Sequence, residues 1–224
     1  MPEKPSLIFA LISFLPVAFA AIGLLALAKM LSRKSEVVGE LGYIGCFLIF
    51  AGNLLSAIGN LIYATTGNEA AWMKNGLLFL SAPGFVCLAW ALWRAFRSDS
   101  NKLTAGAVWL LPLFFNGGLL ALTAALKMVI GGQAWLKLLL TVVTVASVFV
   151  FAQLALAALK SQKQFVAVLF ILSLGMSLAI SLRANDGTLV EAWAQQVSKI
   201  LSQTIFAYAS LQIGKLARLA AQKP

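Results

Sequence analysis

The sequence contains no histidine and only 7 acidic residues among its 224. Histidine is the commonest metal ligand and general base in proteins, so its absence removes most routes to metal chemistry and acid–base catalysis. No carboxylate pair, phosphate-binding glycine loop or cluster of metal ligands takes its place. We therefore expect a protein that is not an enzyme and that holds no cofactor or metal ion.

Charge is also scarce. Only 11% of the residues are charged, against about 25% in an average soluble domain, and 61% are apolar, with a mean hydropathy of +0.93. A soluble fold could not cover its surface with so few polar side chains, and disorder is excluded for the same reason. The net charge of +10 would indicate nucleic acid in a soluble protein, but basic cytoplasmic loops explain it in a membrane protein. We predict an integral membrane protein that contacts the lipid bilayer and no nucleic acid.

There are only two cysteines, Cys46 and Cys87, and both lie in apolar runs. Two thiols without histidine make a poor metal site, and a disulfide would require them to be adjacent. We interpret both as small buried apolar side chains.

What is abundant is long apolar runs separated by charges. About 20 apolar residues in a helix cross a bilayer core of roughly 30 Å. We predict an all-α, seven-helix transmembrane bundle that forms a single domain over residues 1–224. Its helices are expected at about 6–29, 41–66, 75–95, 104–128, 136–159, 164–182 and 190–214, the first of them kinked at Pro16. The seventh is contested, because only 15 uncharged residues separate Lys199 from Lys215.

Basic residues are unevenly distributed between the two sides of this bundle. One side would hold 11 of them: Lys29, Arg33, Lys34, Arg94, Arg97, Lys102, Lys160, Lys163, Lys215, Arg218 and Lys223. The other would hold 6: Lys4, Lys74, Lys127, Lys137, Arg183 and Lys199. The positive-inside rule then places the N-terminus outside and the C-terminus in the cytoplasm, and we expect the bacterial inner membrane.

Tryptophans open three of the predicted helices. Residues 71–74 (AWMK), residues 134–137 (AWLK) and Ala192-Trp193 stand at similar positions. One interpretation is that Trp72, Trp135 and Trp193 are anchors at the membrane interface. The other is that one helix is followed by three copies of a helical hairpin, as in transporters with parallel repeats.

Polar side chains inside the apolar runs are the candidate site. They form a predicted neutral polar core around the seventh helix, made of Asn53, Asn60, Asn116, Gln153, Gln196, Lys199, Gln203 and Tyr208. Such a core suits an uncharged or zwitterionic solute or a hydrated path. It does not suit proton pumping, because no acidic residue lies within these runs.

Two further prolines, Pro83 and Pro112, interrupt predicted helices, and Asn116, Gly117 and Gly118 follow the second. A broken helix near the membrane midplane is typical of transporter binding sites. We therefore predict kinks at both prolines and a weakened helix after Pro112.

Small residues form faces on two helices. Gly52, Ser56 and Asn60 share a face of the second helix, and Ser173, Ser177 and Ser181 share a face of the sixth. Small residues favour close helix packing. These faces are also candidate docking surfaces for a second copy or for a partner membrane subunit.

Lys199 allows two interpretations. If the last helix begins near Leu189, Lys199 lies about 15 Å along it, close to the midplane. If residues 188–198 instead lie along the interface, Lys199 is an anchor there. Seven helices with an outside N-terminus and a lysine in the last helix resemble the layout of the microbial rhodopsins. This resemblance implies that Lys199 carries retinal, but the carboxylate counterion usual on the third helix is absent, and Phe165 and Phe170 are the only aromatics of the sixth.

Three functions follow from these features. The first is a small transporter, channel or solute- or lipid-binding protein with its polar core around the seventh helix. The second is a non-catalytic scaffold or accessory subunit, and the third is an opsin-like receptor.

Overall fold

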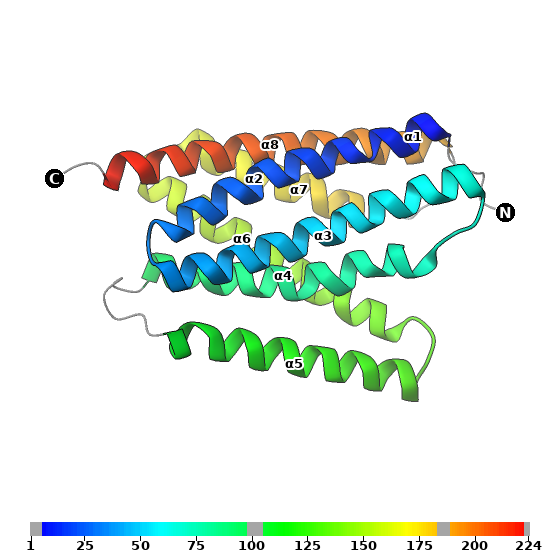
Figure 1. Ribbon diagram of the computed structural model, residues 1–224. Coiled ribbons are helices and arrows are strands. Elements are labelled where there is room, and N and C mark those ends of the chain that lie inside the picture. Colours follow the sequence, from blue (N-terminus) through cyan, green and yellow to red (C-terminus); the bar gives the residue numbers. More distant parts are fainter. Residues whose placement is uncertain (1–5, 98–104, 183–188, 222–224) are drawn as a thin grey trace.

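The computed structural model describes residues 6–97, 105–182 and 189–221. In these ranges the chain forms helices and no strand. The helices are α1 (Leu7–Ile12), α2 (Phe14–Ser32), α3 (Glu36–Thr66), α4 (Ala71–Arg97), α5 (Ala105–Val129), α6 (Ala134–Lys160), α7 (Gln164–Leu182) and α8 (Leu189–Ala221). α1 and α2 lie in line, separated only by Ser13 (Figure 1). The prediction of an all-α protein is confirmed for the described residues.

Five helical segments are long and apolar enough to cross a membrane. They are Leu7–Ser32, Glu36–Thr66, Asn75–Arg97, Val108–Val129 and Ala134–Lys160. Gln164–Ile180 is an apolar helix of shorter length, and α8 is long but falls outside this group because of its polar residues. These helices support membrane integration, and the presence of seven spans stays a prediction.

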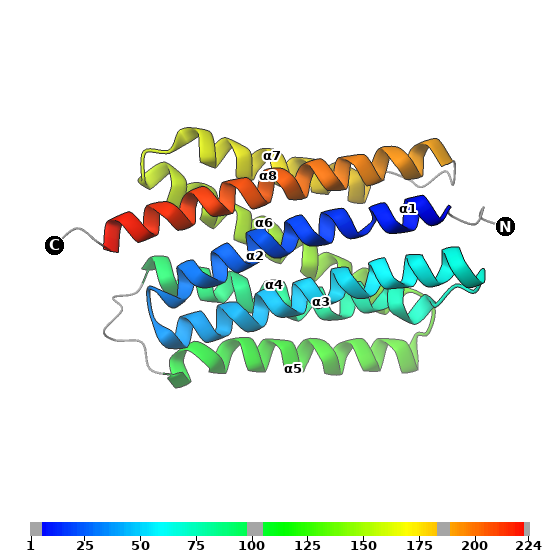
Figure 2. The same cartoon turned by 45° about the horizontal axis from the view of Figure 1, so that its top comes forward.

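The helices run up and down and surround a common interior. α2, α3, α4, α6, α7 and α8 each pack against the next, and α8 closes the ring against α2. α5 lies outside this ring, with looser contacts to α4 and α6 (Figures 1 and 2). The three hairpins therefore pack differently, which the hairpin-repeat hypothesis does not predict. The first and last helices run side by side, so residues far apart in sequence meet in the interior.

The two ends of the bundle differ in their side chains. α1 begins at one end of the bundle, called the N-terminal end, and α8 ends at the opposite one, called the C-terminal end (Figure 1). The C-terminal end holds most of the described basic residues: Lys29, Arg33, Lys34, Arg94, Arg97, Lys160, Lys163 and Lys215. Arg33 Nη1 donates there to the Gly214 carbonyl oxygen at 3.3 Å and fastens α2 to α8. This asymmetry follows the predicted pattern, although the side of the membrane that each end faces stays a prediction.

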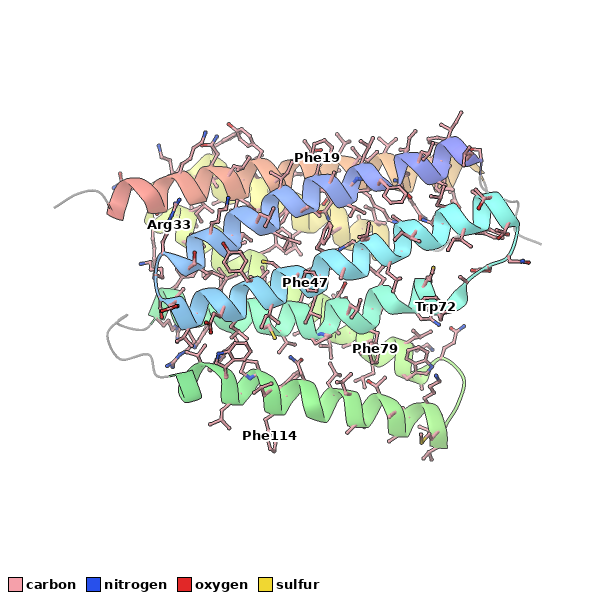
Figure 3. The ribbon with its side chains drawn as sticks, in the orientation of Figure 1. Phe19, Arg33, Phe47, Trp72, Phe79 and Phe114 are labelled. Carbon is pink, nitrogen blue, oxygen red and sulfur yellow. The ribbon has the colours of Figure 1, made fainter. Side chains whose placement is uncertain are left out.

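The three tryptophans that begin α4, α6 and α8 lie toward the N-terminal end. Trp72 is 65% exposed (Figure 3). The Lys127 ammonium lies 5.6 Å from the centre of the Trp135 ring, and Trp193 packs edge-on against Phe9 at 5.2 Å. The position of these three tryptophans at helix starts on one end of the bundle fits the interface-anchor interpretation.

α3 and α4 approach until their backbones touch. Gly45, Gly52 and Gly59, spaced by seven residues, face α4. A Cβ atom on Gly45 would lie 2.8 Å from the Gly84 carbonyl oxygen, and one on Gly84 would lie 2.9 Å from the Gly45 oxygen. The glycines of α3, including Gly52 of the predicted small-residue face, therefore pack against α4 within the chain.

Candidate functional site

Two adjoining cavities lie inside the ring. The smaller, of about 220 Å³, is bounded by Ser13 between α1 and α2 and by residues of α2, α3, α4, α7 and α8. Its polar lining consists of Ser13, Asn53, Ser56, Asn60, Ser177, Gln196, Lys199, Ser202 and Gln203. Five of the eight predicted polar-core residues are thus brought together around one space.

The larger cavity, of about 460 Å³, has mostly apolar walls. They include Leu24, Ile49, Phe85, Leu88, Val150, Phe151, Leu174 and Phe206 from α2, α3, α4, α6, α7 and α8. Six residues line both cavities: Asn53, Leu77, Ser177, Ile180, Lys199 and Gln203. We call the joined space the Lys199 cavity; it has a polar end, an apolar end and Lys199 between them.

Lys199 lies in the interior part of α8 and not at its start. It follows Leu189 by ten residues, about 15 Å along the helix axis. Its side chain lines both cavities and is exposed rather than buried. No acidic residue of the described ranges lines either cavity. The structure therefore favours the interpretation that places this ammonium inside the bundle.

Gln196 binds a backbone carbonyl that a proline in the first helix leaves without its helical donor. Proline has no backbone N–H, so Pro16 leaves the carbonyl of Ile12, four residues earlier, without its helical donor. Gln196 Nε2 donates to that oxygen at 3.2 Å, and the Gln196 side chain is only 5% exposed. Ser13, between α1 and α2, keeps right-handed helical backbone angles, with φ −64° and ψ −14°. The predicted polar residue Gln196 thus binds the carbonyl that Pro16 leaves free; α1 and α2 lie in line (Figure 1), and the kink at Pro16 stays a prediction.

Pro112 has an equivalent partner. It leaves the Val108 carbonyl without a helical donor, and Trp90 Nε1 donates to that oxygen at 2.9 Å. α5 nevertheless continues unbroken from Ala105 to Val129, and α4 continues through Pro83. α5 is therefore not broken after Pro112, where the indole of α4 satisfies the freed carbonyl, and the kinks at Pro83 and Pro112 stay predictions.

Serines join α7 to α8 beside the cavity. Ser173 Oγ donates to the Ser202 carbonyl at 2.9 Å, and Ser202 Oγ lies within 3.0 Å of the Ser173 carbonyl. Ser177 Oγ and Ser202 Oγ are 2.8 Å apart. This face packs within the chain, and the side chain of Ser181 lies outside the described residues.

Three predicted core residues are elsewhere. Gln153 Nε2 on α6 donates to the Ala89 carbonyl at 3.2 Å, and Asn116 Nδ2 on α5 donates to Cys87 Sγ at 3.4 Å. Tyr208 is 49% exposed and lines neither cavity. The first two fasten helices to α4, so the polar core is smaller than predicted. Cys46 and Cys87 are buried free thiols, as interpreted.

The sequence did not indicate Ser13 or the apolar end of the cavity. Ser13 Oγ donates to the Ala10 carbonyl at 2.6 Å at the break before Pro16. A serine one turn before a helix proline is a signal that could have found it. The apolar walls consist of residue types that are common throughout the chain, so no local signal marks them.

No model of a protein family matches the chain, and no curated protein or solved structure matches it. What the chain does must therefore be inferred from its own residues.

Proposed function

We propose that this is an integral membrane protein that binds a small solute or lipid in the Lys199 cavity, as a transporter, channel or binding protein without enzymatic activity. The supporting observation is the convergence of amide, hydroxyl and ammonium groups from α1–α2, α3, α7 and α8 on one space among apolar helices. Polar groups at membrane depth are costly unless they face a partner, water or a ligand. The Lys199 cavity provides space for water or a ligand beside these polar groups.

The polar end lies in the half of the bundle toward the N-terminal end. Asn60 is six residues, about 9 Å, from the end of α3 at Thr66. In the orientation that the basic residues favour, this half faces the outside. A solute would then reach Asn60 first and Lys199 deeper in the bundle.

Thiol accessibility tests this proposal. In a background with Cys46→Ala and Cys87→Ser, we expect Asn53→Cys and Asn60→Cys to react with a membrane-impermeant thiol reagent added outside intact cells. The matched control is Phe114→Cys, because Phe114 on α5 is 84% exposed and points away from the bundle (Figure 3). That position should face lipid and stay unlabelled. Equal failure of all three cysteines to react, with each protein folded, would contradict the proposal.

The opsin-like receptor is a second candidate, since Lys199 adjoins an apolar cavity. A Schiff base there would lack a carboxylate from the described cavity lining. An absorbance scan after addition of retinal separates the two candidates: a red-shifted band that Lys199→Met abolishes would favour the receptor.

The scaffold hypothesis needs a free docking surface. The glycines of α3 and the serines of α7 pack within the chain. α5 instead offers an exposed apolar side that includes Phe114, Gly117 and Gly118. A Cβ atom added to either glycine would have no neighbouring atom within 4 Å. A partner subunit or lipid would therefore contact α5 before either predicted face.

A further inference from the structure

We propose that the ligand of the Lys199 cavity is an amphipathic anion, with a single carboxylate or phosphate head group at Lys199 and a hydrocarbon tail in the larger cavity. This inference rests on the proposed function and names its ligand class. It differs from the uncharged or zwitterionic solute that the sequence favours, because it uses the position of Lys199 between two unlike spaces.

The charge of the lining determines the head group. Lys199 is the one charged residue among the described residues that line the two cavities, and no described acidic residue pairs with it. An uncompensated ammonium at this depth is costly, and an anion would offset that cost through a charge-assisted hydrogen bond. A zwitterion would also need an acidic partner for its own cation, which the described lining does not contain.

The neighbouring amides fit an anionic head. Asn53 Nδ2 is occupied by the Ile49 carbonyl at 2.8 Å. The Asn60 and Gln203 side chains line the polar end, and neither makes a hydrogen bond to another described residue. Their N–H groups have no acceptor among the described residues, and carboxylate and phosphate oxygens each accept several hydrogen bonds. One ammonium with neutral donors suits a single anionic head group, whose further oxygens can accept from the amides.

The larger cavity provides the site for a tail. It has twice the volume of the polar one, about 460 against 220 Å³. Its walls include Phe151 and Phe206, whose ring centres are 5.5 Å apart. Since six residues line both spaces, Lys199 among them, one molecule can hold its head at the amine while its tail lies among apolar side chains. A free small anion would leave the apolar end unfilled.

Ligand-induced stabilisation in lipid nanodiscs tests this inference. The probes are decanoate and decyl phosphate as amphipathic anions, decanol as the neutral tail, and acetate and inorganic phosphate as heads without tails. We expect saturable stabilisation by at least one of the two amphipathic anions. Lys199→Met should weaken its binding about 10- to 100-fold, the range expected for a lost charge-assisted hydrogen bond, whereas Lys199→Arg should retain it. The matched control Tyr208→Phe, on the exposed side of the same helix, should bind as the unchanged protein does.

Several outcomes overturn the inference. One is binding of decanol as tight as that of the amphipathic anions; another is equal binding of acetate or inorganic phosphate. Unchanged affinity in Lys199→Met is a third. If Asn53→Cys is labelled from the aqueous phase but no amphipathic anion binds, the inference on the ligand fails while the proposed cavity stands. If Asn53→Cys is not labelled and no probe binds, both fail.

Discussion

Replacement of Gly45 by leucine is expected to destabilise the bundle strongly, whereas the same replacement at Gly117 should leave the fold intact. At Gly45 even a Cβ atom would lie 2.8 Å from the Gly84 carbonyl oxygen and 2.9 Å from the Leu88 amide nitrogen. These are backbone atoms that no side-chain rotation can remove. α3 and α4 would have to separate along their closest packed faces.

The expected loss in the free energy of unfolding is large for the substitution of a single residue. Overpacking in a well-packed core commonly costs about 1–3 kcal/mol and occasionally more, and a leucine at backbone contact belongs at the upper end. Gly117 also lies within a helix, but nothing is within 4 Å of its built Cβ, and leucine favours helix more than glycine does.

Size-exclusion profiles and thermal unfolding in detergent compare the two variants. Gly45→Leu should elute as aggregate or unfold many degrees earlier, and Gly117→Leu should match the unchanged protein. Gly45→Ala should fall between them. Equal behaviour of both leucine variants would show that the α3–α4 contact is not as close as described.

Replacement of Gln196 by leucine is expected to destabilise the protein through the first helix. It leaves the Ile12 carbonyl, freed by Pro16, without a donor. An unsatisfied buried acceptor costs about 1–3 kcal/mol. Pro16→Ala restores a backbone N–H that can reach Ile12, so the double variant should lose little relative to Pro16→Ala alone.

A double-mutant cycle on thermal or denaturant unfolding measures this coupling. We expect Gln196→Leu to cost at least about 1 kcal/mol more in the presence of Pro16 than in its absence. Gln153→Leu is the control, because Gln153 binds the Ala89 carbonyl and has no relation to Pro16. Additive effects of Gln196→Leu and Pro16→Ala would show that the contact does not compensate for the proline.

The positions of the helices could be predicted because they depend on composition alone. Charged residues interrupt apolar runs whose lengths match a bilayer, and this pattern does not require knowledge of packing. Polar residues inside the runs could likewise be singled out, since they are costly in lipid. Asn53, Asn60, Gln196, Lys199 and Gln203 were found in this way and line one cavity.

Which polar residues share a site could not be predicted, because that depends on the order of helices around the ring. α5 lies outside it, so Asn116 meets Cys87 and not the cavity. Gln153 faces α4 instead of α8 for the same geometric reason. Helix breaks could not be predicted either, since Pro112 is compensated by Trp90, a residue 22 positions away in sequence.

The central claim is that Lys199 lies inside the bundle, beside a cavity that holds a ligand. A density map of the protein in lipid nanodiscs that shows side chains tests it most directly. We predict Lys199 within the ring of helices and an elongated density that starts at its ammonium and extends between Phe151 and Leu174. Lys199 at the membrane surface, or side chains that close the space between α3, α7 and α8, would contradict the account.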